Sequence, residues 1–197
     1  MEQAHADVCG GNVCRSSDLL LAFVNSGPHG SGQAELLGDT EALAAWMTGA
    51  GLMGDSEAIT GADAVAGREL RDALATVFRA HSDCPDGAML LSDAEEYLRR
   101  TAERYPLTLR ITAEGCDLAP SQTGILGAFG ALFAAAADLA SRGIWARMKV
   151  CKNPTCHSGF FDKTRNSSGL YCGSACSSQA AQRAYRSRLK SEKGLQR

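Results

Sequence analysis

Four cysteines near the C-terminus constrain this chain more than any other feature. They lie in CKNPTCHSGFFDKTRNSSGLYCGSAC, residues 151–176, with the spacing Cys151-x4-Cys156-x15-Cys172-x3-Cys176. Two close pairs separated by a short loop are what a tetrahedral zinc ion with four thiolate ligands requires. A disulfide pair and a catalytic thiol cluster are the alternatives. Asp162 is the only acid in the stretch, which argues against a catalytic centre that needs an acid–base residue beside the metal.

The rest of the sequence favours metal ligation. The first 18 residues contain acidic residues and no continuous apolar segment, so they do not have the pattern of a secretory signal. The uncharged segment 118–137 has only about 14 apolar positions, from Gly124 onward, and we interpret it as a buried core helix, not a membrane span. We therefore expect a cytoplasmic protein, in which cysteines bind metal or stay reduced more often than they form disulfides.

The charge of the chain is divided unevenly between its two ends. Residues 1–141 hold eight Lys and Arg against 20 Asp and Glu, whereas residues 142–197 hold 12 against two. The balances of −12 and +10 give the net charge of −2 for the 197 residues. An acidic N-terminal part joined to a basic C-terminal part suggests that the basic part binds a polyanion.

Hydrophobic periodicity predicts a mainly α fold with minor β. Helices are expected at about 40–49, 61–81, 92–105 and 122–142, and a short strand at 107–114. Asp39 and Thr40 suit a helix N-cap, Ser92 to Glu95 fits a capping box, and Ser121 suits the cap of the longest helix. The apolar run 18–25 fits either a strand or a buried helix.

The cysteine-rich segment is too small to fold without metal. Its apolar residues are few: Phe160, Phe161, Leu170 and Tyr171. Zinc binding, which contributes roughly 10–16 kcal/mol in small zinc peptides, would supply the folding energy. We expect a turn at Pro154 inside the first cysteine pair. A second turn near Asn166 would make the segment between the two pairs a β-hairpin.

A basic helix is predicted directly after Cys176. Arg183, Arg186, Lys190, Lys193 and Arg197 recur at helical spacing along one stripe, and Arg188 lies off it. Such side chains neutralise phosphates and release counterions. The candidate nucleic-acid contacts are Lys163, Arg165, Gln179, Arg183, Arg186, Arg188, Lys190 and Lys193. A solvated basic tail is the alternative interpretation.

These residues together resemble the CGNR zinc finger. The resemblance rests on the four cysteines, on Phe160-Phe161-Asp162, on Thr164-Arg165-Asn166 and on the basic helix. The N-terminal part is similar to an ABATE domain in LLLAFVN (19–25), Leu43-Ala44-Ala45-Trp46 and RELRDALATVFRA (68–80). Cys176 is followed by Ser177-Ser178-Gln179, where the family has Gly-Asn-Arg, and Gly169-Leu170-Tyr171 replaces a basic pair and Trp.

The resemblance implies a domain order and a function. We expect a flexible extension at 1–17, a helical ABATE-like domain at 18–145 and a zinc finger with its basic helix at 146–197. The family is a predicted bacterial, stress-induced transcription regulator, so we expect one zinc per chain and binding to double-stranded DNA. The N-terminal domain would sense a small-molecule effector or mediate oligomerisation. A zinc-dependent protein- or RNA-interaction module is the alternative.

Other functional sites are not evident in the sequence. It contains no phosphate-binding Gly loop, nucleophile elbow or paired acid–base constellation, and we expect no enzymatic activity. Cys9 and Cys14 form another x4 pair. A second metal site would need ligands from distant segments such as Cys84 or Cys116, so we interpret these cysteines as incidental thiols.

Overall fold

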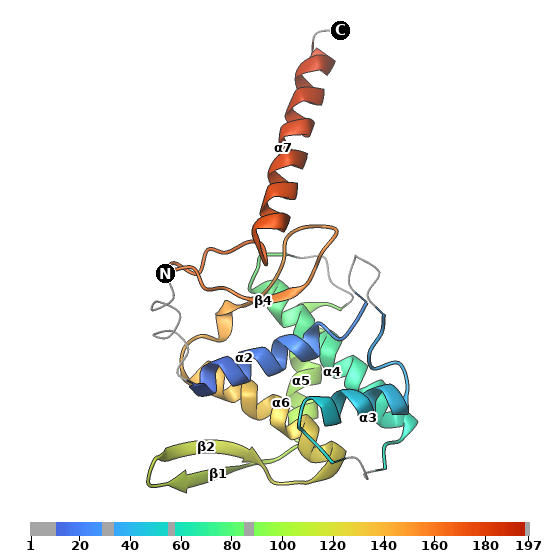
Figure 1. Cartoon of the computed structure of the whole chain (residues 1–197), viewed down its shortest axis with the longest axis vertical. Helices are drawn as coiled ribbons and strands as arrows, with labels where there is room; N and C mark the ends of the chain where they lie inside the picture. The colour runs from blue at the N-terminus through green and yellow to red at the C-terminus, as the bar shows by residue number, and fades with distance from the viewer. Residues whose placement is uncertain (1–10, 29–33, 55–57, 85–88, 196–197) are drawn as a thin grey trace.

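Helices α2, α4 and α6 form the centre of the N-terminal part of the chain (Figure 1). The computed structural model describes residues 11–28, 34–54, 58–84 and 89–195. The elements in order are α2 (Gly11–Val24), α3 (Thr40–Gly49), α4 (Gly61–Ala80), α5 (Leu91–Ala102), β1 (Leu107–Thr112), β2 (Gly115–Pro120), α6 (Gly124–Ser141), a 3-10 turn (Trp145–Arg147), β3 (Met148–Val150), β4 (Gly159–Phe161) and α7 (Ser174–Leu195). The mainly helical prediction is confirmed.

One hydrophobic core joins these helices. Phe23 of α2, Phe78 of α4 and Phe129 of α6 are almost completely buried within it. Among the described helices, α6 is long and apolar enough to cross a membrane by length and composition. Its Leu132 and Leu139 are buried in the core, as expected of the core helix that the sequence predicts. The apolar run 18–25, which the sequence left open, belongs to helix α2, and this helix begins at Gly11, within the segment expected to be an extension.

One of the predicted helix caps is present, and two predicted cap positions differ. The Asp39 carboxylate accepts a hydrogen bond from the Ala42 amide at 2.9 Å and starts α3. The Ser92 hydroxyl instead donates to Asp93, because α5 begins one residue earlier, at Leu91. Ser121 lies 2.6 Å from the Thr108 hydroxyl and ties the end of β2 to β1, so α6 starts after Thr123 without a side-chain cap.

Two small antiparallel hairpins complete the fold. The predicted strand at 107–114 is β1, and it pairs with β2, which the sequence reading missed. The second hairpin differs from the prediction. Its strands are β3 and β4, and they flank the first cysteine pair, so the turn of the hairpin is the loop 151–158. Met148 and Val150 of β3 are buried in the core of the helices, which explains why the strand lies before Cys151.

Gly127 is required for the start of α6. A Cβ atom at this position would lie 2.4 Å from the main-chain oxygen of Gln122, which cannot move away as a flexible side chain would. Gly127→Ala is therefore expected to lower the free energy of unfolding by about 1–3 kcal/mol, measured by urea denaturation. Gly49→Ala is the control, because nothing lies within 4 Å of the added methyl group and alanine favours the helix. Equal stability of the Gly127 variant and the wild type would contradict this interpretation.

Candidate metal centre and basic helix

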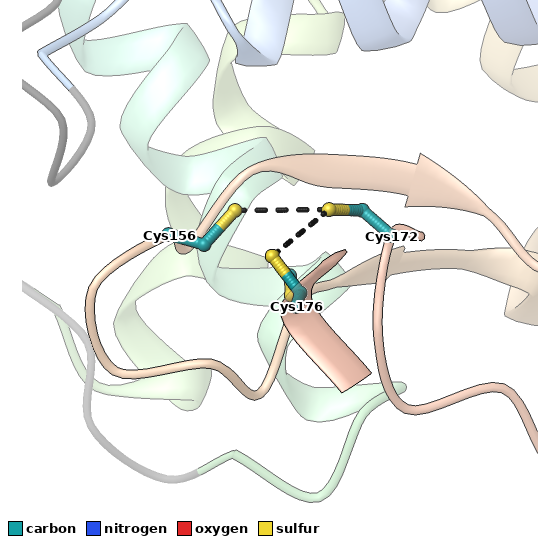
Figure 2. Close-up of side chains that lie close together, drawn as sticks. Cys156, Cys172 and Cys176 are labelled. Atoms are coloured by element: carbon teal, nitrogen blue, oxygen red, sulfur yellow. Dashed lines mark hydrogen bonds between the residues drawn. The ribbon is translucent and has the colours of Figure 1, made fainter. Parts of the chain in front are cut away.

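The four cysteines of the C-terminal segment meet at one point. Cys151 follows β3, Cys156 lies in the loop before β4, and Cys176 is in the first turn of α7. Figure 2 shows the Cys172 sulfur in contact with those of Cys156 and Cys176. Each of these two separations is 3.7 Å, and all four sulfurs lie within 4.8 Å of one another. The structure thus brings together the four cysteines that the spacing predicts as one site.

The arrangement fits a zinc ion held by four thiolates. A zinc–sulfur bond of about 2.3 Å gives sulfur–sulfur edges of about 3.8 Å in a tetrahedron, close to the 3.7 Å separations of Cys172 from its two neighbours. The six cysteines whose side chains are described, including Cys84 and Cys116, are free thiols, so none of them forms a disulfide with another. Cys9 lies outside the described residues.

The neighbouring histidine does not belong to this ligand set. His157 follows Cys156, but its Nδ1 lies 3.5 Å from the Arg79 guanidinium of α4. The group of metal-ligating side chains found in the described part of the chain consists of the four cysteines alone. A centre with four protein ligands is closed, which is typical of structural zinc and leaves no position for a reacting water.

The thiols differ in how readily they ionise. Burial raises the pKa of Cys151, and burial together with hydrogen bonds to Cys176 and Cys156 raises the pKa of Cys172. Burial also acts to raise the pKa of Cys156, but hydrogen bonds with the hydroxyl and backbone of Ser158 lower it to about 7. In the metal-free chain Cys156 therefore ionises more readily than Cys151 and Cys172, and zinc must displace the protons of those two thiols.

A buried ion pair shapes the loop between the cysteine pairs. Lys149 of β3 donates to Asp162 at 2.7 Å, and the side chains are 7% and 0% exposed. The Asp162 carboxylate also accepts hydrogen bonds from the Thr164 amide at 2.9 Å and hydroxyl at 2.7 Å, and from the Gly169 amide at 2.7 Å. Asp162 therefore returns the chain toward Cys172. The sequence pattern does not predict this role, although a single acid in a basic segment is a visible signal.

The finger is fixed to the helical body by specific hydrogen bonds. The Asn25 side chain accepts from the Gly159 amide at 2.7 Å and donates to the Gly159 carbonyl at 3.0 Å. Ser82 accepts from the Val150 amide at 2.9 Å, and His81 Nδ1 lies 2.8 Å from the Met148 carbonyl. A side chain at Gly159 would contact α2, since its Cβ would lie 3.3 Å from Val24. The finger therefore holds a defined position on α2 and α4.

Asn153 links the first cysteine pair to the basic helix. This buried side chain donates to Gln179 at 2.9 Å and accepts a hydrogen bond from the Arg183 guanidinium. Its oxygen also accepts from the Thr155 amide and hydroxyl. Two of the predicted nucleic-acid contacts, Gln179 and Arg183, thus lie against the finger, where they hold the first turns of α7.

The other basic candidates lie on exposed surface. Lys163 and Arg165 are exposed in the loop after β4, and Arg186 and Arg188 are exposed on α7. Lys190 and Lys193 belong to α7, beyond the positions whose side chains are described. Helix α7 projects away from the body, and the hairpin β1–β2 lies at the opposite end of the molecule (Figure 1). The base of α7 is therefore anchored while its distal part extends into solvent.

Comparison with known families gives two matches in sequence order. The family described as putative stress-induced transcription regulator, ABATE, matches residues 17–143, and the CGNR zinc finger matches residues 147–189. These ranges confirm the resemblance and domain order drawn from the sequence. No curated protein matches the chain. Neither family is enzymatic, and the zinc finger accords with the four gathered cysteines and one zinc ion. The chain therefore belongs to the ABATE family and carries a CGNR zinc finger after its ABATE domain.

Proposed function

We propose that this protein is a cytoplasmic, zinc-containing bacterial transcription regulator that binds double-stranded DNA through its finger and α7. The observation that carries the proposal is the projecting basic helix, anchored at its base by the cysteine cluster and by Asn153. A helix of 22 residues is about 33 Å long, enough to follow the major groove or the backbone of a duplex. Most helical stability in proteins comes from tertiary packing, which the projecting part of α7 lacks, so a polyanionic partner would also stabilise it.

The basic residues are proposed to divide into two roles. Lys163, Arg165, Arg186, Arg188, Lys190 and Lys193 would contact phosphates or base edges. Gln179 and Arg183 would mainly set the direction of α7, because their side chains already bind Asn153. The ABATE domain would sense an effector or mediate association, and its hydrogen bonds to β3 and β4 support transmission of either event to the finger.

Fluorescence anisotropy against a duplex at several salt concentrations tests the proposal. If about five phosphates are contacted, log K should fall with log salt at a slope of about −4 to −5. Arg186→Ala should weaken binding and reduce the slope by about one. Arg99→Ala is the matched control, because Arg99 is an exposed arginine of α5 that pairs with Glu96 and Glu103 on the acidic body.

Competition identifies the partner. Structured RNA that displaces the duplex at equal concentration would favour the RNA-interaction alternative, and absence of binding at low salt would exclude the proposed function. Selection of bound sequences from a random duplex pool would then show whether the contacts read bases or only the backbone.

A further inference from the structure

The hairpin β1–β2 has one apolar face that the chain leaves largely uncovered. Its register pairs Leu107 with Pro120, Leu109 with Leu118, and Ile111 with Cys116. Directly opposed residues lie on the same face and side chains alternate along a strand, so these three pairs share one face of the hairpin. Toward the turn this face is open to solvent, since Leu109 is 55%, Leu118 41% and Ile111 76% exposed.

A hairpin of this kind is poorly stable on its own. Two-stranded sheets are marginal in water, and unpaired strand edges favour pairing with another chain. Within the part of the chain that the structure describes, β1 and β2 pair only with each other. The hairpin contacts the body through β2 and α6, so its outer half extends beyond the core that stabilises the rest of the domain (Figure 1).

A groove beside the hairpin provides a complementary surface. It has a volume of about 530 Å3 and is bounded by the hairpin, α2 and α6. Small side chains of α6, those of Ala131, Ala134 and Ala137, form part of its wall, together with Leu19 of α2. Apolar side chains of the hairpin of a second copy would pack against this wall. The hairpin of the first copy would pack against the groove of the second in the same way, as in an isologous two-fold interface.

The charges around this groove favour another copy of the chain as the second molecule. Residues 1–141 carry a charge balance of −12, so two bodies repel each other where their acidic surfaces meet. The groove is different, because its ionisable residues are Arg15, Arg110, Arg142, Asp117 and Asp138, with both signs present and one positive charge in excess. Arg110 pairs with Asp117 and Arg142 with Asp138, each at 2.6 Å.

These paired charges are compatible with an interface formed by the same surface of two copies. Exposed Arg–Asp pairs can exchange partners between two copies, and an apolar centre with a polar, charge-balanced rim is the usual organisation of a protein interface. We propose that the hairpin β1–β2 and the adjacent groove form the homodimer interface of this protein. The proposal does not depend on DNA binding, and the interface lies at the other end of the molecule from α7 (Figure 1).

Sedimentation equilibrium of the full zinc-loaded chain tests the proposal. The average mass should rise with concentration from the 20.7 kDa of one chain toward twice that value. Ile111→Arg should weaken association at least about tenfold, because the charge would be buried among apolar side chains. Val65→Arg is the matched control, since Val65 is a β-branched residue on α4 that is 45% exposed and lies outside the groove.

A second measurement covers the case in which the Ile111 variant does not fold, which circular dichroism and zinc content would reveal. Amide exchange of the wild-type residues 107–120 should slow as the concentration rises, while the exchange of α3 should not change. A wild-type mass that stays at 20.7 kDa up to several hundred micromolar would overturn the proposal. Association of the folded Ile111 variant as tight as that of the wild type, or exchange of 107–120 that is independent of concentration, would also overturn it.

Discussion

Cys172→Ser is expected to release zinc from the protein and to unfold the finger. Cys172 has the central position among the sulfurs, 3.7 Å from both Cys156 and Cys176. Loss of one thiolate opens a four-ligand site, and zinc contributes roughly 10–16 kcal/mol to the folding of small zinc peptides. Elemental analysis should give one zinc per wild-type chain and less than about one tenth of that in the variant.

The unfolding should extend beyond the cysteine loop. Met148 and Val150 of β3 are buried in the core of the helical body, and β4 is bound by Asn25. A finger without metal would release these contacts, so thermal unfolding of the whole chain should begin at a lower temperature. Amide exchange should accelerate first at 147–176 and then at the adjoining parts of α2 and α4. The base of α7 would lose its anchor, and the proposed DNA binding would fall with it.

Cys116→Ser is the control for this prediction. Cys116 is an exposed free cysteine of β2 that does not belong to the four-cysteine cluster. At a concentration low enough to keep both proteins monomeric, the zinc content and the melting temperature of this variant should match those of the wild type. Stoichiometric zinc in the Cys172 variant, or a metal-free wild-type chain whose finger is fully folded, would contradict the structural role of the centre.

The sequence predicted the metal centre better than its surroundings, for a physical reason. Four cysteines in two close pairs can converge on one ion through local turns alone, so their spacing carries the information. The same holds for the cap of α3, where Asp39 binds an amide three residues away. By contrast, the hydrogen bonds of Asn25 with Gly159 join residues 134 positions apart. No local pattern encodes such a contact.

The first turns of α7 have a different role from the predicted one, again because the contacts that decide it join residues far apart in the sequence. Helical spacing placed Arg183 and Arg186 on one stripe, and the stripe suggested that both contact nucleic acid. The spacing does not say what lies opposite the first turns of the helix. In the structure Asn153 occupies that place and binds both Gln179 and Arg183. Gln179 stands where the family has the arginine of its Gly-Asn-Arg motif, and here this position contributes to the anchoring of the helix.

Asp162→Asn is expected to destabilise the protein by about 3–5 kcal/mol, the range found when one partner of a buried ion pair is removed. The Lys149 side chain is 7% exposed and would lose the carboxylate that pairs with it. The loop held by Asp162 through Thr164 and Gly169 would lose part of its support as well. Urea denaturation of the zinc-loaded proteins measures the difference in the free energy of unfolding.

Asp117→Asn is the matched control. Asp117 also pairs with a basic residue, Arg110 at 2.6 Å, but the two side chains are 55% and 62% exposed. Solvent screens such a pair, so the monomer should lose less than about 1 kcal/mol. The comparison is made at a concentration low enough to keep both proteins monomeric. An Asp162 variant as stable as the Asp117 variant would show that the buried pair contributes little.

The pH dependence of the Asp162 effect has a defined sign. Burial acts to raise the pKa of this carboxyl, but hydrogen bonds from Lys149 and Thr164 outweigh it and lower the pKa to about 2. A carboxyl whose pKa is lower in the folded state stabilises the protein fully above its unfolded pKa, about 3.9, and loses this contribution as the pH falls toward 2. This part amounts to about 2–3 kcal/mol. The stability difference between wild type and Asp162→Asn should therefore stay constant from pH 8 to pH 5.

Subtracting the two stabilities removes the pH dependence of zinc binding, because both proteins have the same four thiolates. A difference that grows as the pH falls from 7 to 5 would mean that the pKa of Asp162 is raised in the folded protein, and that Lys149 does not hold it ionised.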